Sequence, residues 1–421
     1  MTAPAPRVAL VPWGTPLEVF LDPLGRTLDD FCDRLTGGWL FGYAAALASA
    51  GYAPTLVVSS RSTTTRSTRT HLPTGTPVTV LPAPAQSPPR PPGLRRNLGA
   101  YRRALPPGLL RELAGHDVVL LQEYEEPRAD LLAWWGRIRG VPVAASFQGG
   151  VPPWERAPVE RLVRAPSLRR LAALLVGSRA EAERLVAERR VDAARVFSVV
   201  NPVDVDAWSP GDRGAARSEL GLPKDAFVVA WHGRVDLRRK GLDVLVEAWS
   251  ALCSRRPDAD LRLLLVGTGP DETALRTLLD RSAARGVAWL DRYAPPAEVR
   301  QRLAACDVWV SPSRHEGFAV APLEAMASGR PVVVTDVPGA EEMIGRSAEH
   351  GGLLVPRDDP AALSGAMHLL SGLSGDDLAG CGRRARRRVE DVFSVGAVGR
   401  QLDAALRAMT ATASRSGGQA G

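Results

Sequence analysis

The chain has little cysteine, and its four cysteines lie far apart, at Cys32, Cys253, Cys306 and Cys381. No two of them form a CxxC pair, so their spacing supports neither a zinc site nor a disulfide framework. We therefore expect four reduced thiols, most of them buried in the fold.

Long apolar runs are also missing. No stretch of the sequence reaches the roughly 18 consecutive apolar residues that a membrane-spanning helix needs. The N-terminal segment MTAPAPRVALVPWG contains only a short apolar run, without the apolar core and cleavage site of a secretion signal. These absences predict a cytoplasmic protein.

What the sequence contains is the balance of a soluble globular protein. It has 421 residues, of which 45% are hydrophobic and 24% charged, and this length suits two domains of ordinary size. The formal net charge is +7, and arginine makes up nearly all of the basic residues. That excess favours anionic partners such as nucleotide diphosphates, phosphorylated acceptors, acidic lipid surfaces or nucleic acid.

Short apolar runs alternate with helix-forming stretches in the first half of the chain. Arg7–Trp13 predicts a first buried strand, and Gly37–Ala50 predicts a glycine turn that opens an alanine-rich helix. Two segments, Arg61–Thr70 and Pro82–Pro92, lack apolar periodicity and are expected to be loops. Further strands are expected at Thr55–Ser59, Asp117–Gln122, Val141–Phe147, Leu171–Gly177 and Val196–Val200.

The alternation restarts after Asn201–Pro210, a segment rich in turn residues that predicts a domain linker. Beyond it we expect helices at Leu242–Leu252 and Thr273–Arg285, and strands at Phe227–Trp231, Leu261–Val266, Val287–Leu290, Val308–Ser311 and Val332–Thr335. This pattern predicts an α/β protein of two Rossmann-like, doubly wound domains that face each other across a cleft. We place the domains at residues 1–203 and 204–390, followed by a helix and tail at 391–421.

The segment WHGRVDLRRKG places two cations in a loop after a strand. Arg234 and Lys240 can converge on one anionic group, and Gly233 lets the backbone approach a ligand. A planar guanidinium fork together with a point charge suits a diphosphate. Taken alone, the segment is more typical of an exposed basic loop.

The most informative stretch is SPSRHEGFAVAPLEAMASGRPVVV. Glu316 lies in the loop after a strand, and Glu324 lies eight residues later on the helix that follows. A glutamate on the apolar side of such a helix is unusual unless it has a partner. One carboxylate can accept hydrogen bonds from sugar hydroxyls and the other from a ribose, and the amides of Gly317, Phe318 and Ala319 offer an anion site. The alternative is a pair of solvated glutamates.

Together these segments resemble a known family. The order of GGWLFGYAAALASAGY, NPVDVDAW, HGR…RRKG, LLLVGTGP, PSRHEGFAVAPLEAMASGRPVV and GGLLVP is similar to that of the retaining glycosyltransferases of family 4, which have the GT-B fold. The resemblance is dense from Val196 to Pro356, and the two glutamates eight residues apart are the family's signature. It implies transfer of a hexose from a nucleotide-diphosphate sugar, UDP- or GDP-linked, to an acceptor hydroxyl.

The resemblance also implies roles for individual residues. Arg234 and Lys240 would bind the donor diphosphate, and Glu316 would hold hydroxyls of the donor sugar, so these three carry the expected catalysis. Glu324 would bind the ribose hydroxyls, and Tyr293 would border the nucleobase.

Backbone groups complete the implied donor site. The amides of Phe318, Ala319 and Val320 would meet the sugar or a phosphate. Gly37 and Gly38 would form the loop of the N-terminal domain that faces the diphosphate. The final helix, around residues 395–409, would cross back to that domain.

Two positions depart from the family pattern. Ala319 stands where relatives have a glycine, which is a mild change if only its N–H is used. Many relatives place a histidine after the strand that matches Val141–Phe147, where this chain has Gln148 and then Gly149. Glutamine can hydrogen-bond a sugar or the reaction centre but cannot act as a general base. A retaining reaction in which the leaving phosphate takes the proton needs no such base.

No metal and no cofactor besides the donor sugar are expected, because no DxD-like acidic pair stands at a strand end. The acceptor is expected to be a small molecule, a lipid-linked sugar or a glycan. Nucleic acid is not expected, because no docking motif or interleaving of basic and stacking aromatic residues is present. Peripheral contact with an anionic membrane stays open on account of Arg383–Arg388, Arg161, Arg164, Arg169 and Arg170.

Three alternatives remain at this point. The first is a phosphorylase or an epimerase of the same fold. A phosphorylase often needs a lysine-bound cofactor, but the only two lysines, Lys224 and Lys240, lie in no such context. A catalytically silent or regulatory nucleotide-sugar-binding protein would not be expected to retain both glutamates and both cations. The third alternative is a basic protein that binds membranes or nucleic acid.

Overall fold

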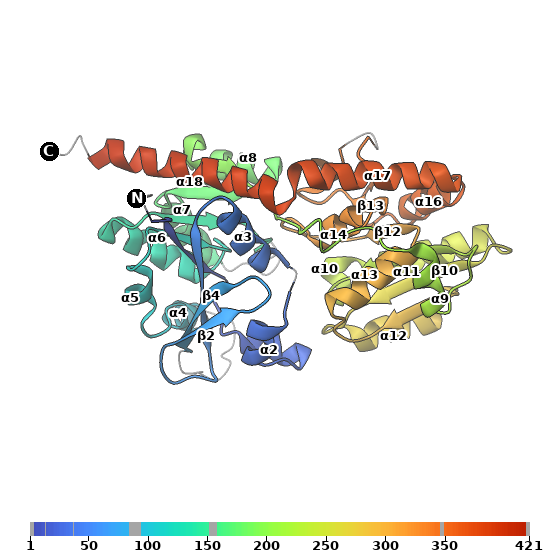
Figure 1. Ribbon diagram of the computed structural model, residues 1–421, viewed down its shortest axis with the longest axis horizontal. Coiled ribbons are helices and arrows are strands. Elements are labelled where there is room, and N and C mark those ends of the chain that lie inside the picture. Colours follow the sequence, from blue (N-terminus) through green and yellow to red (C-terminus); the bar gives the residue numbers. More distant parts are fainter. Residues whose placement is uncertain are drawn as a thin grey trace. The chain divides into compact units, whose positions relative to one another are not determined.

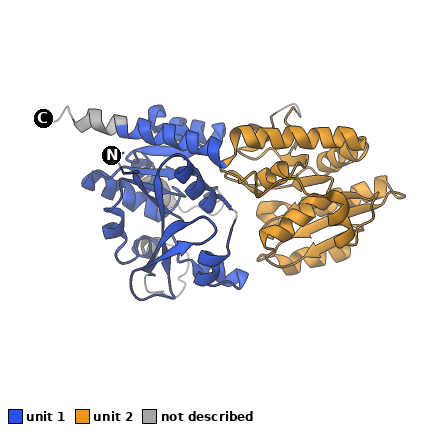
Figure 2. Ribbon diagram, in the orientation of Figure 1, with its two compact units in different colours: residues 1–201, 395–421 blue, residues 202–394 orange. Residues whose placement is uncertain are grey.

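The computed structural model describes residues 4–12, 14–36, 38–83, 94–150, 158–345 and 349–417 (Figure 1). The chain divides into two compact units (Figure 2). Unit 1 comprises residues 1–201 and 395–421, and unit 2 comprises residues 202–394. Each unit is built on its own largely parallel sheet.

The described residues of unit 1 form one eight-stranded sheet in the order β3-β4-β2-β1-β5-β6-β7-β8. All neighbours pair in parallel except β3 and β4, which are antiparallel. Apart from β3 this is a doubly wound order, whose direction reverses between β1 and β5. The strands are β1 (Arg7–Val11), β2 (Ala53–Ser60), β3 (Ser67–His71), β4 (Thr76–Pro82), β5 (Val118–Leu121), β6 (Val143–Ser146), β7 (Ala173–Val176) and β8 (Val196–Ser198).

The helices of unit 1 include one from the far end of the chain, α18 (Val395–Gly417), which packs on α3 (Gly38–Ser49). The approach is close, because a Cβ at Gly399 would lie 2.6 Å from the Ser49 hydroxyl oxygen. Tyr52 adds a hydrogen bond from its hydroxyl to Asp403 at 3.0 Å. The other helices are α1 (Glu18–Leu21), η1 (Asp22–Leu24), α2 (Leu28–Asp33), α4 (Leu94–Arg103), α5 (Leu109–Leu113), α6 (Pro127–Arg139), α7 (Pro158–Leu168), α8 (Arg179–Ala187) and η3 (Ala193–Arg195).

The strands predicted for this half of the chain are confirmed, but one predicted loop is wrong. Residues 67–70 of Arg61–Thr70 belong to β3, which pairs with β4 along the edge of the sheet. Their serine, threonine and arginine side chains give the segment a composition typical of a loop, although β-branched threonine favours strands. The strand β4 was not expected either. Most of Pro82–Pro92 lies outside the described residues.

Unit 2 has a six-stranded sheet in its described residues, entirely parallel, in the order β11-β10-β9-β12-β13-β14. This is the Rossmann order, with its switch point between β9 and β12. The strands are β9 (Phe227–His232), β10 (Leu261–Val266), β11 (Val287–Leu290), β12 (Val308–Ser311), β13 (Val332–Thr335) and β14 (Gly352–Val355). All but β14 were predicted.

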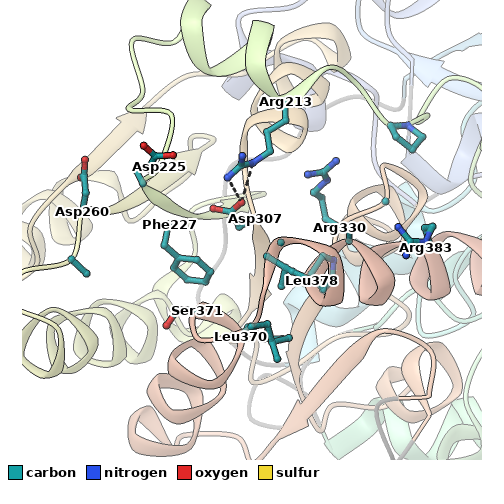
Figure 3. A pocket seen from close by; sticks show the side chains of 18 of the residues that line it. Arg213, Asp225, Phe227, Asp260, Asp307, Arg330, Leu370, Ser371, Leu378 and Arg383 are labelled. Atoms are coloured by element: carbon teal, nitrogen blue, oxygen red, sulfur yellow. Dashed lines mark hydrogen bonds and ion pairs between the residues drawn. The ribbon is translucent and has the colours of Figure 1, made fainter.

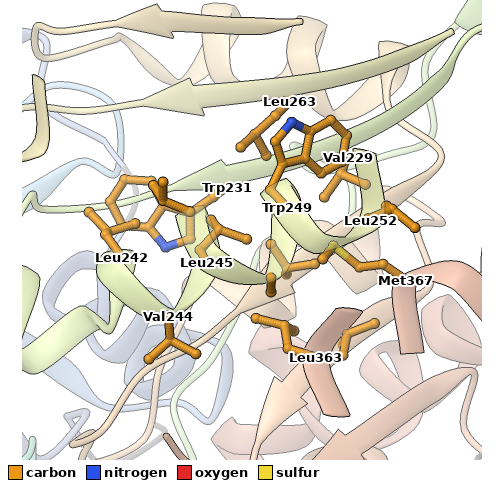
Figure 4. Close-up of a cluster of buried hydrophobic side chains, with 14 of the residues drawn as sticks. Val229, Trp231, Leu242, Val244, Leu245, Trp249, Leu252, Leu263, Leu363 and Met367 are labelled. Atoms are coloured by element: carbon orange, nitrogen blue, oxygen red, sulfur yellow. The ribbon is translucent and has the colours of Figure 1, made fainter. Parts of the chain in front are cut away.

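In unit 2, helix α11 (Leu242–Arg255) packs against the sheet through a dense apolar core (Figure 4). Val229 and Trp231 on β9 meet Leu242 and Trp249 of α11, and all four are buried. This packing fixes the start of α11 beside the end of β9. The helices are α9 (Arg213–Glu219), α10 (Leu237–Lys240), α11 (Leu242–Arg255), α12 (Glu272–Arg281), α13 (Pro296–Ala305), α14 (Ala321–Ala327), α15 (Ala340–Ile344), α16 (Pro360–Ser371) and α17 (Gly375–Val392).

Two expectations from composition can be compared with the fold. Cys32, Cys253 and Cys306 are buried free thiols and Cys381 is partly buried, as predicted. Among the described residues, no helix combines the length and apolar character that crossing a membrane requires.

Candidate functional site

The switch point of unit 2 brings two predicted motifs together. In an open parallel sheet, ligands bind at the carboxyl ends of the strands where the order reverses. Here β9 ends at His232 and its neighbour β12 ends at Ser311. The basic loop and the loop that carries Glu316 therefore leave the sheet side by side.

Lys240 and Glu316 form an ion pair at this edge. The Lys240 Nζ lies 2.5 Å from Glu316 Oε1, and the Ser313 hydroxyl donates to the same oxygen at 2.7 Å. The Glu316 side chain is only 8% exposed. Burial alone would raise the pKa of Glu316, but the charge of Lys240 and the two hydrogen bonds hold that pKa below its usual value. Oε1 is thus committed, and Oε2 is left to accept from a ligand.

His232 and Glu324 form a second pair beside the first. His232 Nε2 lies 2.9 Å from Glu324 Oε2, and the Trp309 indole N–H donates to His232 Nδ1 at 2.9 Å. Because an indole can only donate, Nδ1 must be the unprotonated nitrogen. The imidazole is therefore held as the neutral Nε2–H form, which donates to Glu324. This fixes one carboxylate oxygen of Glu324 and leaves Oε1 for a ligand hydroxyl.

Arg314 holds the short helix α10, and hence Lys240, against the rest of the site. Its guanidinium donates to both oxygens of Asp243 at 2.8 and 2.7 Å, and to the Leu237 carbonyl at 3.1 Å. The backbone N–H of Arg314 donates to the Arg239 carbonyl at 2.9 Å. These contacts hold the pKa of Asp243 below its usual value despite burial. The side chain that sequence reasoning left without a role is the one that positions the lysine.

Glycine is required where the loops of the site approach one another. Gly267 follows β10 with a φ of +133°, and a Cβ there would lie 1.9 Å from the Gly233 carbonyl oxygen. Gly241 ends α10, and a Cβ there would lie 2.0 Å from the Pro312 carbonyl oxygen. Gly233 therefore lies in a layer of closely packed backbone at the strand ends.

The segment before α14 presents backbone donors. Gly317 and Phe318 are buried, and the Phe318 ring packs on Phe393 with centroids 5.8 Å apart. Ala319 and Val320 are partly buried, and Val320 caps α14 without a side-chain hydrogen bond. Within the described part of the chain, the amides of these last two residues have no hydrogen-bond acceptor.

Arg234 and Tyr293 lie on loops at the same edge of the sheet. Arg234 is exposed and has no carboxylate partner among the described residues, so its charge is available to a ligand. Tyr293 follows β11 and is partly buried, and Arg292 donates to its carbonyl at 3.1 Å.

Gln148 belongs to unit 1, at the carboxyl end of β6. Its Nε2 donates to Asn201 Oδ1 at 3.0 Å and to the Ser146 hydroxyl at 3.3 Å, and Asn201 Nδ2 donates back to Gln148 Oε1 at 2.9 Å. Both amide protons are therefore used within the protein. The side chain can offer a ligand only a lone pair of its oxygen.

Glu123, which sequence reasoning missed, holds the loop that Gln148 begins. One of its oxygens accepts from the amides of Gln148 at 3.1 Å and Gly150 at 2.8 Å, and the other from Glu125 at 2.8 Å. Burial raises the pKa of Glu123 to about 7. Gly149 lies inside this loop with a φ of +109°.

Of the two other glycines predicted in unit 1, only one can be placed. Gly38 begins α3 with a φ of +69°, a left-handed conformation that favours glycine. Gly37 lies outside the described residues.

A cavity of about 690 Å³ lies at the opposite edge of the unit 2 sheet (Figure 3). Its lining includes Phe227 at the start of β9, Asp307 just before β12 and Arg330 just before β13. Arg213 and Asp307 pair across it at 2.9 Å. None of the predicted site residues lines it, because they lie at the carboxyl ends of the same strands.

Two sequence families match the chain. "Glycosyl transferases group 1" matches residues 226–371, and "Glycosyl transferase 4-like domain" matches residues 40–202. The chain therefore carries both sequence domains of the family 4 glycosyltransferases. The first match contains every predicted site residue of unit 2, and the second contains Gln148 and Gly149.

Curated relatives match part of the chain. D-inositol 3-phosphate glycosyltransferase of Saccharomonospora viridis is 39% identical over 195 residues, 44% of each chain. D-inositol 3-phosphate glycosyltransferase 1 of Catenulispora acidiphila is 33% identical over 270 residues, 60% of this chain and 63% of its own. The match spans about half the length of these relatives.

Solved structures show the fold. Sucrose-phosphate synthase from Thermosynechococcus elongatus aligns with a TM-score of 0.67 at 22% identity, over 97% of this chain and 100% of its own. Anabaena HepE in complex with UDP-glucose aligns with a TM-score of 0.70 at 17% identity, over 96% and 99%. The chain therefore has the GT-B fold, as predicted.

Proposed function

We propose that the protein transfers a hexose from a nucleotide-diphosphate sugar to an acceptor hydroxyl, with retention at the anomeric carbon. The observation that carries the proposal is the pair of adjacent carboxylates at the switch point of unit 2. Each has one oxygen fixed by the protein, Glu316 by Lys240 and Glu324 by His232. The second oxygen of each faces no protein donor in the described residues, which suits the hydroxyls of a sugar and a ribose.

The cations of the site supply the electrostatics of the reaction. The bond between the anomeric carbon and the diphosphate oxygen breaks, and the acceptor oxygen forms a bond to the same face of that carbon. Negative charge develops on the departing diphosphate, where Arg234 and Lys240 would stabilise it. The acceptor hydroxyl gives its proton to the leaving phosphate oxygen, so no protein base is needed. This agrees with Gln148, which has no basic group.

The proposal assigns the diphosphate charge to these two side chains rather than to a divalent ion. It also favours an active enzyme over a silent nucleotide-sugar-binding protein, because Arg234 is unpaired while Lys240 is held in place by Arg314 through α10. The nucleoside of the donor is proposed to be uridine, in line with the UDP-glucose in the HepE structure.

The test is turnover of UDP-, GDP- and ADP-sugars in the presence of candidate acceptors and EDTA. We expect release of one nucleoside diphosphate, unchanged by EDTA, and a product whose anomeric proton shows the configuration of the donor. Lys240→Ala and Glu316→Gln should each lower kcat by at least about tenfold, since each loses an interaction with the reacting sugar or phosphate. An inverted product would refute the retaining proposal, and loss of activity in EDTA would refute metal independence.

A further inference from the structure

A second cluster of charge lies in unit 1, in a small cavity away from the loop that Gln148 begins. The cavity has a volume of about 250 Å³ and is lined by Arg137, Arg169, Arg170 and Arg195. Arg137 lies on α6, which packs against α7, while the other three lie just before the first residues of β7 and β8. The cluster is therefore at the amino edge of the sheet, whereas Gln148 follows the carboxyl end of β6.

The four guanidinium groups have no counter-charge in the part of the chain that the structure describes. Within the described residues, none of them lies within ion-pairing distance of a carboxylate. Arg184 of the same unit shows the usual contrast, since it pairs with Glu125 at 2.9 Å and Glu181 at 2.6 Å. Four like charges around one cavity repel one another, and an anion in the cavity would relieve that repulsion.

Three of the four arginines are also held in place for an incoming anion. Arg170 donates to the Pro166 carbonyl at 2.7 Å, and its guanidinium lies 3.6 Å from the centre of the Trp134 ring. Arg195 donates to the Arg169 carbonyl at 2.9 Å, and Arg169 donates to the Arg189 carbonyl, just beyond α8, at 3.1 Å. Each of these three guanidinium groups thus uses one N–H within the protein and keeps others free. Such forks match the geometry of phosphate oxygens.

We propose that this cavity binds a phosphoryl group, as a phosphomonoester or phosphodiester, at a site separate from the transfer reaction. The surroundings suggest two sources for it, a soluble phosphorylated molecule or the headgroup of a phospholipid. Trp134 is 45% exposed and Ile138 is 79% exposed, and both flank Arg137 on α6. Exposed apolar side chains beside cations are the combination that binds anionic bilayers.

The site differs from the basic surface expected from the sequence. Arg164, which was grouped with Arg169 and Arg170, is buried and contacts Asp130 at 3.4 Å and the Glu126 carbonyl at 2.7 Å. That part of the expectation was wrong, because Arg164 faces inward on α7. The side chain of Arg161 lies outside the described residues.

The first arm of the test titrates the full chain with inorganic phosphate in a calorimeter. Arg137→Gln is the informative variant, because this exposed side chain makes no hydrogen bond in the described structure and its loss should leave folding intact. We expect phosphate to bind about tenfold more weakly to it, the loss of one charge-assisted hydrogen bond. Arg139→Gln removes the same charge from the same helix, outside the cavity, and should bind like wild type.

The outcome that overturns this assignment is equally specific. Phosphate held instead by the donor loop would be lost in Arg234→Gln and kept in Arg137→Gln. Equal weakening in Arg137→Gln and Arg139→Gln would show general charge attraction and no built site. Because donor binding is not measured, failure here leaves the proposed transfer reaction untouched.

The second arm uses sedimentation with vesicles of phosphatidylcholine, with and without phosphatidylglycerol. Binding to the mixed vesicles that is lost in Arg137→Gln, and weakened in Ile138→Ser, assigns the phosphoryl group to a lipid. Phosphate binding that Ile138→Ser leaves unchanged, without vesicle binding, assigns it to a soluble molecule. Binding in neither arm overturns the proposal.

Discussion

Substitution of Lys240 by methionine tests how the donor site is built. It leaves the Glu316 carboxylate, 8% exposed, with the Ser313 hydroxyl as its remaining side-chain donor. Removing one partner of a buried ion pair typically costs about 3–5 kcal/mol. The Lys240 side chain is 23% exposed, so solvent screens part of the pair. We therefore expect the free energy of unfolding to fall by about 2–3 kcal/mol.

The double variant Lys240→Met with Glu316→Gln separates two contributions to the loss of stability, the lost contact and the buried carboxylate left without a counter-charge. A neutral amide at position 316 needs no counter-charge, so we expect the double variant to recover most of the stability that the single variant loses. Urea unfolding, followed by fluorescence at fixed pH, gives both free energies.

The pH dependence supplies a second criterion. In wild type the pKa of Glu316 lies below its ordinary value of 4.5, so the stability from this pair is present above that pH and is lost as the pH falls through the lowered pKa. Without Lys240, burial raises the pKa of Glu316. The deficit of Lys240→Met should then be larger at pH 8 than at pH 5. If the single and double variants are equally stable, or the deficit is independent of pH, the reasoning fails.

Three further predictions follow from the geometry. Gly267→Ala should lower the free energy of unfolding by more than about 3 kcal/mol, because its Cβ would meet a carbonyl oxygen at 1.9 Å. Gly365→Ala, inside α16 with open space around it, should change that free energy by less than about 1 kcal/mol, and thermal unfolding compares the two variants. Trp309→Phe removes the donor that fixes the His232 tautomer and should raise the Kd for the donor nucleotide by about three- to tenfold, measured by titration; an unchanged Kd contradicts that role. The pKa of Glu123 is raised from its ordinary value of 4.5 to about 7, so the free energy of unfolding of wild type should fall as the pH rises from 4.5 to about 7. Glu123→Gln should flatten that slope in unfolding experiments.

The sequence was sufficient to predict the parallel sheets and the motif that carries Glu316 and Glu324. Buried parallel strands are continuous apolar runs, and a glutamate inside an apolar helix is conspicuous. The edge strand β3 escaped prediction because its polar residues lack that signal. The prediction that Gln148 serves the reaction centre stays a prediction, as do the roles of Tyr293, Gly37 and Gly38.

Contacts between distant residues could not be predicted. Asn201 lies 53 residues from Gln148, and no local pattern connects the two. Likewise, nothing around Arg314 in the sequence distinguishes it from an exposed arginine, although it holds α10 through the Leu237 carbonyl and α11 through Asp243. The protonation state of His232 also depends on Trp309, 77 residues away, which only the fold brings beside it.

The most direct test of the central claim is calorimetric titration of UDP, GDP and ADP into wild type and Glu324→Gln, with EDTA present. We predict that one nucleotide binds wild type without a metal ion and binds Glu324→Gln at least about tenfold more weakly, because one ribose hydrogen bond to a carboxylate is lost. A nucleotide that binds both proteins equally would place the donor elsewhere. Absence of binding by all three would contradict the donor site altogether.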